Sequence, residues 1–154
     1  MTLQDLYRIA EDHGIDVASF RLPESGSLAL ERDGRQYIGM DNSHRYPAGE
    51  EAAHLGHELG HCLYGGFYSE KTARDTIMRH EVRADKWYIE NAIPRAELQK
   101  LLAKGYDAWE IADKMGTTEA YIEKACAYYE LSRQQKETLW AGDFGKVSRL
   151  VLSG

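Results

Sequence analysis

One short stretch constrains the fold of this chain more than any other: residues 57–61 read HELGH, inside the longer run EEAAHLGHELGHCLYGG. Residues four apart on a helix lie on nearly the same face, so a helix here directs His57 and His61 toward one point. Leu59 and Cys62 fall on a separate face of that helix, which we expect to pack into the core. The stretch therefore predicts a helix with one histidine face and one core face, and Cys62 as a small buried residue rather than a metal ligand.

This pattern matches the His-Glu-x-x-His signature of zinc enzymes. A catalytic zinc ion usually keeps three protein ligands and one open position, so a third ligand must come from elsewhere in the chain. Glu81 and Asp85 lie one turn apart on the apolar face of the next predicted helix, and a buried carboxylate is costly without a partner. Salt bridges to basic side chains are the alternative. We predict that His57, His61 and Glu81 bind Zn²⁺, and that Asp85 accepts a ring N–H of a liganding histidine.

Glu58 adds the prospect of catalysis to this site. Beside a zinc ion it would act as general base, taking a proton from water and delivering it to a leaving amine, which indicates peptide-bond hydrolysis. His54 lies one turn before His57, and we expect it and Tyr64 on the substrate side of the site, with a bystander role for His54 as the alternative. His80 is a weaker ligand candidate than its neighbour Glu81. The side chain that assists the oxyanion stays open among four residues: His54, Tyr64, Tyr68 and His80.

Periodicity along the rest of the chain predicts an α+β fold, mainly helical, with a small three-stranded antiparallel sheet beside the zinc-binding helix pair. The turn-forming sequences PESG and RDG separate the three strand-like runs. The predicted helices outside the histidine stretch cover about residues 2–13 and 71–92, and the predicted strands cover 15–20, 27–31 and 35–41. The predicted domains are a metallopeptidase domain over 1–94, a helical module over 95–133, and a tail or edge strand over 134–154.

Composition limits the classes of partner. In a chain of 154 residues, a formal net charge of −6 argues against nucleic acid or an anionic membrane as the main partner, because those contacts need clustered positive charge; a local basic patch stays open. It has a polar start, no apolar run of membrane-spanning length and only two cysteines, so we expect a reduced cytoplasmic protein that makes no membrane contact. Nothing in the sequence indicates an oligomer.

Residues 108–128 resemble a helix-turn-helix in the spacing of Ala112, Gly116 and Ile122. The second helix of that motif is acidic, however, and an acidic helix repels phosphates. We therefore expect no direct DNA binding, and interpret the module as structural or as a docking surface for a protein substrate.

Taken with the later stretch HEVRADKWYIENAIP, HELGH resembles the ImmA/IrrE family of zinc metallopeptidases, in which a Glu-x-x-Ala-Asn/Asp-x-Phe/Trp-Ala block follows His-Glu-x-x-His. The match covers about residues 35–95, and the spacing of Glu81 and Asp85 is also similar to that in the thermolysin-like gluzincins, which implies a zincin-like domain. The chain departs from the family at Tyr88, where a small residue is usual and a tyrosine would narrow the cleft.

The resemblance implies a cytoplasmic anti-repressor protease of a prophage or integrative element, which cleaves a helix-turn-helix transcriptional repressor. An edge strand such as QYIGMD, residues 36–41, would pair with an extended substrate segment. The alternative function is a non-proteolytic zinc-binding regulator that acts by binding a partner or DNA. Glu58 favours the enzyme, because a binding module needs no general base beside its metal.

Overall fold

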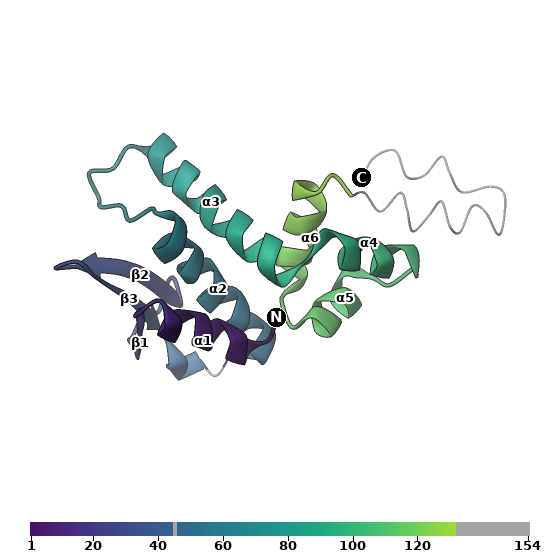
Figure 1. Ribbon diagram of the computed structural model, residues 1–154, viewed down its shortest axis with the longest axis horizontal. Coiled ribbons are helices and arrows are strands. Elements are labelled where there is room, and N and C mark those ends of the chain that lie inside the picture. Colours follow the sequence, from purple (N-terminus) through teal and green to yellow (C-terminus); the bar gives the residue numbers. More distant parts are fainter. Residues whose placement is uncertain (45, 132–154) are drawn as a thin grey trace.

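Helices dominate the protein, as the spacing of its apolar residues predicts. The computed structural model describes residues 1–44 and 46–131, and the predicted α+β class is confirmed (Figure 1). The predicted tail over 134–154 lies outside the described residues. Among the helices that are described, none is both long and apolar enough to cross a membrane. The elements in chain order are α1 (Leu3–Asp12), β1 (Asp16–Ser19), β2 (Ser27–Arg32), β3 (Arg35–Met40), the 3₁₀ turn η1 (Asn42–His44), α2 (Ala48–Tyr64), α3 (Arg74–Ala92), α4 (Arg95–Ala103), α5 (Ala108–Met115) and α6 (Glu119–Tyr128).

The sheet is mixed, so the prediction of a fully antiparallel sheet is wrong in one pairing. Its order is β1-β3-β2, with β2 antiparallel and β1 parallel to β3. A tight hairpin at Asp33 and Gly34, both with positive φ, joins β2 to β3. The longer connection after β1 instead carries the chain past β3, and Asp41 fixes it by accepting a hydrogen bond from the Leu22 amide at 2.8 Å. Residues 36–41 therefore run along the central strand, and of the two edge strands β2 is the one that packs against α2.

Two glycines allow α2 and α3 to pack closely side by side (Figure 1). A Cβ atom on Gly60 would lie 2.5 Å from the backbone oxygen of Ala84, so only glycine fits there. One turn earlier, Gly56 leaves the space that the Tyr88 ring occupies. Tyr88 is 1% exposed and its hydroxyl hydrogen-bonds Thr117 at 2.9 Å, so its ring fills the core between helices. The expectation that Tyr88 narrows the cleft is wrong, because a glycine on the facing helix accommodates it.

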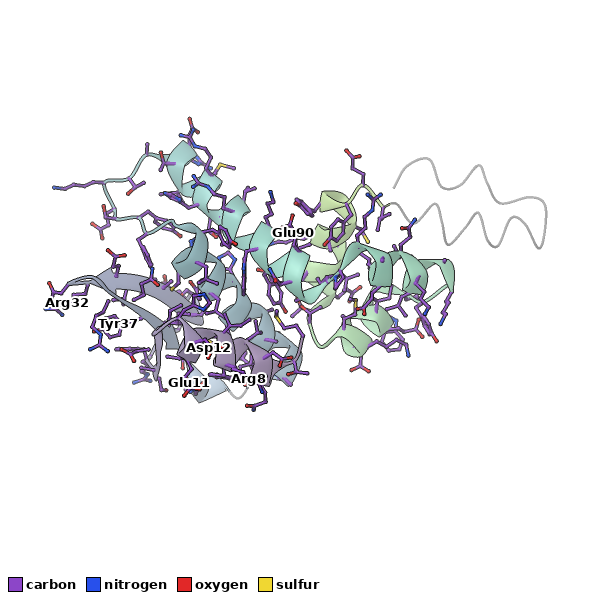
Figure 2. The ribbon with its side chains drawn as sticks, in the orientation of Figure 1. Arg8, Glu11, Asp12, Arg32, Tyr37 and Glu90 are labelled. Atoms are coloured by element: carbon purple, nitrogen blue, oxygen red, sulfur yellow. The ribbon has the colours of Figure 1, made fainter. Side chains whose placement is uncertain are left out.

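Helices α5 and α6 pack into the same hydrophobic core as α2. Ile111, Ile122 and Ala125 are fully buried in the same hydrophobic cluster as Leu55 of α2. Glu90 of α3, labelled in Figure 2, accepts a hydrogen bond from Tyr128 of α6. A domain boundary after residue 94 remains a prediction, and the apolar packing is continuous across it.

Candidate metal centre

Three side chains from α2 and α3 converge where the two helices pack most closely. His57 and His61 are separated by one helical turn, with 3.1 Å between their Nε2 atoms. Glu81 of α3 lies opposite, with one carboxylate oxygen 3.0 Å from His57 Nε2 and the other 3.1 Å from His61 Nε2. These three residues form a group that could hold a metal ion, since their ligand atoms all lie within 4.8 Å of one another. The structure thus brings together the three predicted ligands.

The hydrogen bonds of the two rings suit metal binding. His61 Nδ1 lies 3.0 Å from the carbonyl oxygen of Gly66, and His57 Nδ1 lies 2.8 Å from Asp85 Oδ1. Both partners accept hydrogen bonds, so each ring carries a hydrogen on Nδ1 and directs Nε2 toward the centre of the group. Ligand atoms 2.0–2.1 Å from a tetrahedral zinc ion would be roughly 3.3 Å apart, close to the separations observed. The donor set therefore fits a divalent transition metal.

Charge in the metal-free protein also favours a cation at this point. Hydrogen bonds from His57 and His61 hold the pKa of Glu81 well below its usual range. Burial would lower the pKa of His57, but its hydrogen bonds to Asp85 and Glu81 outweigh burial and raise that pKa to about 9. Without metal, His57 thus carries a second ring proton at neutral pH, in addition to the hydrogen on Nδ1. A metal ion that binds to His57 must displace this second proton.

Glu58 lies beside the ligands with its carboxylate fixed. Its side chain is 7% exposed, and the Ser27 hydroxyl of β2 donates a 2.7 Å hydrogen bond to Oε1. The Ser27 hydroxyl has only one hydrogen, which it donates to Glu58. It therefore accepts a hydrogen bond from His54 Nδ1, 2.9 Å away. His54, Ser27 and Glu58 therefore form a hydrogen-bonded chain that ends at the predicted general base.

Asp85 has the neighbour predicted for it and two further donors. In addition to the His57 ring, it accepts hydrogen bonds from the Tyr121 hydroxyl at 2.7 Å and from Lys124 Nζ at 2.9 Å. Burial would raise the pKa of Asp85, but these three hydrogen bonds lower it to about 2. A carboxylate held by α6 thus orients a histidine on α2.

A cavity of about 560 Å³ opens over the group, and His54, His57, Glu58, His61 and Glu81 all line it. Residues 27–29 of β2 form one wall, and Tyr121 and Lys124 of α6 form another. Tyr68 lines the cavity as well and donates a 2.7 Å hydrogen bond to Glu81. The cavity thus extends from the metal group along the edge strand.

Other residues named from the sequence lie elsewhere. Tyr64, at the end of α2, is 59% exposed and is not among the residues that line the cavity, so its substrate-side role stays a prediction. His80 stacks on Tyr68 and packs against Gly66, outside the metal group. Cys62 is buried in the core, as predicted, and burial raises the pKa of its thiol to about 12.

Three polar residues of the site were not predicted: Ser27, Tyr121 and Lys124. Each reaches the site from an element far from HELGH in the sequence, and no local motif marks it. Ser27 is distinguished only in the structure, where this first residue of the strand SLALER is 6% exposed and the following Leu28 is 46% exposed. The sequence does not show this reversal of the usual burial, which places the serine against a polar partner.

Comparison with known proteins adds no relative: no protein-family model, curated protein or solved structure matches the chain.

Proposed function

We propose that this protein is a zinc-dependent endopeptidase with Glu58 as its general base. One observation carries the proposal: a nearly buried carboxylate, fixed by a serine hydroxyl, shares a cavity with two histidines and a glutamate whose donor atoms converge. A metal site that served only structure would need no such carboxylate, and structural zinc sites are usually closed by four protein ligands.

The donor set is the basis for naming zinc. Two imidazoles and one carboxylate, with a cavity on the remaining side, match the ligands of zinc hydrolases. Among hard cations, calcium and magnesium prefer oxygen ligands throughout and would leave the imidazoles unused.

The residues have distinct roles in the proposed mechanism. When bound, the metal ion would lower the pKa of water and polarise a peptide carbonyl. Glu58 accepts the proton of the attacking water and passes it to the leaving amine. Ser27 holds one oxygen of Glu58, which leaves the other oxygen for the proton. Of the four candidates for assisting the oxyanion, His54 and Tyr68 line the cavity.

An extended peptide segment is the substrate that suits this cavity. Residues 27–29 of the edge strand β2 line it, so an incoming segment could add to the sheet there and place its scissile bond over the metal group. This assigns to β2 the pairing role that the sequence suggested for residues 36–41. The motif resemblance to the ImmA/IrrE family supports a helix-turn-helix repressor as substrate and an anti-repressor role in a prophage or integrative element. Neither Cys62 nor Cys126 forms a disulfide within the described part of the chain, which suits a cytoplasmic protein.

The test is cleavage of a candidate repressor by wild type and by Glu58→Gln. Glutamine keeps an acceptor for Ser27 and removes the base, so we expect normal zinc content and a fall in cleavage rate of about 10²- to 10⁴-fold. Glu97→Gln, which neutralises an exposed carboxylate on α4, is the matched control and should cleave normally.

Derepression of the target promoter would be read in the same cells. If Glu58→Gln relieves repression as fully as wild type without cleaving the repressor, the protein acts by sequestration and the peptidase proposal fails.

A further inference from the structure

The metal group and the C-terminal helices are connected through one carboxylate. Asp85 binds the ring of His57 with the same oxygen that accepts from Tyr121, and its other oxygen accepts from Lys124. The Tyr121 hydroxyl is itself 3.2 Å from His57 Nδ1. A histidine on α2, an aspartate on α3 and a tyrosine on α6 thus meet within hydrogen-bonding distance of one another.

Tyr121 is well placed to fix this arrangement because its ring cannot move freely. It is 9% exposed and packs edge-to-face against Tyr88, with 4.7 Å between ring centroids. Lys124 Nζ covers the ring at 4.8 Å from its centroid, while remaining half exposed at the cavity wall. A phenol that is packed against Tyr88 and covered by Lys124 presents its hydroxyl in a fixed direction, and an aspartate that receives it has little freedom to rotate.

We propose that Tyr121 is a positioning residue of the metal centre: through Asp85 it orients His57 for the metal, and it thereby couples metal binding to the packing of α6. The proposal rests on the metal-binding half of the proposed function and not on peptide hydrolysis. Partners of ligating side chains contribute to metal affinity because they fix ring orientation, and their loss typically weakens binding 10- to 100-fold. Tyr121 acts on the ligand His57 through Asp85, so we expect its loss to weaken metal binding by the lower end of that range.

The coupling works in both directions, because linked binding equilibria are reciprocal. If α6 holds His57 in the orientation that binds metal, then bound metal must stabilise the packing of α6. Helix α6 therefore becomes part of the metal centre, although it lies in the segment that the sequence assigned to a structural or docking module.

The test is the zinc affinity of Tyr121→Phe, measured by titration against a competing chelator. The matched control is Tyr129→Phe, which removes a hydroxyl that donates to the Ile93 carbonyl oxygen at 2.9 Å, away from the metal group. Each variant loses one tyrosine hydroxyl with two hydrogen-bond partners, which for Tyr129 are the carbonyl oxygens of Ile89 and Ile93, so each should be destabilised by about a few degrees in Tm. We expect zinc to bind Tyr121→Phe about tenfold more weakly than wild type, and Tyr129→Phe as wild type does.

Hydrogen exchange of the backbone amides of residues 119–128 supplies a readout that a purely structural role would not change. Zinc should slow this exchange in wild type and in Tyr129→Phe, and should slow it much less in Tyr121→Phe. Unchanged zinc affinity in Tyr121→Phe, or equal zinc-dependent protection in all three proteins, would overturn the inference. Neither result would depend on whether Glu58 supports cleavage, so this test and that of the peptidase can fail separately.

Discussion

Replacing Gly60 by alanine is expected to weaken metal binding in a protein that stays folded. The new Cβ would lie 2.5 Å from the Ala84 carbonyl oxygen, 0.9 Å short of the 3.4 Å at which ordinary contact begins. That obstacle is backbone, so α2 and α3 must shift by an amount of that order. Metal sites tolerate changes in ligand distance of only about 0.2 Å. Since His57 and His61 lie on one helix and Glu81 on the other, the shift separates the ligands.

The effect on stability is modest because two terms oppose each other. Overpacking costs about 1–3 kcal/mol, whereas alanine in place of glycine within a helix gains about 1 kcal/mol. The net loss is therefore about 0–2 kcal/mol, and the variant should stay folded.

Zinc titration and urea denaturation of Gly60→Ala separate these two effects. We expect an affinity loss of at least about tenfold, or about 1.4 kcal/mol, with a modest change in unfolding free energy. Gly39→Ala is the control: its Cβ would meet the movable, exposed side chain of Phe20 on the sheet. Wild-type zinc affinity in a folded Gly60→Ala protein would refute the argument that close helix packing forms the ligand group.

Three further predictions follow from individual residues. His57 in the metal-free protein has a pKa raised from 6.5 to about 9, so its proton stabilises the fold fully below pH 6.5 and that contribution is lost as the pH rises through 9. Urea denaturation should show a fall of about 3 kcal/mol over this interval without metal and a smaller fall with zinc; identical profiles would contradict the assignment of His57 as a ligand. Ser27→Ala should retain zinc and lower kcat about tenfold, because Glu58 loses a hydrogen bond worth about 1.5–3 kcal/mol; an unchanged kcat would remove Ser27 from the mechanism. Ile122→Ala should lower the unfolding free energy by about 2–5 kcal/mol in one transition followed by circular dichroism, whereas two transitions would indicate that the C-terminal helices fold separately.

The ligand group could be predicted because the spacing that defines it is local. His57 and His61 share a face by helical periodicity alone, and the carboxylates of α3 stood out as acidic residues on an apolar helix face. Helix ends were less certain: α3 begins at Arg74 rather than near residue 71, because Ser69 and Thr72 close a hydrogen-bonded turn before it.

The features that the sequence did not predict depend on long-range packing. The residues PESG predicted a tight turn between β1 and β2, whereas the chain there passes β3 and leaves β1 parallel to it. The partners of Glu58 and Asp85 come from Ser27 and Tyr121, each about thirty residues or more away along the chain. The role of the Tyr121 hydroxyl emerges only when α6 packs against α3.

Zinc content per chain tests whether His57, His61 and Glu81 bind one zinc ion beside Glu58. We expect one zinc ion per chain in wild type and in Glu58→Gln, and a large loss of zinc in Glu81→Ala, measured by mass spectrometry of the metal after dialysis. Stoichiometric zinc in Glu81→Ala would show that another residue is the third ligand. A wild-type protein that binds no zinc would contradict the account as a whole.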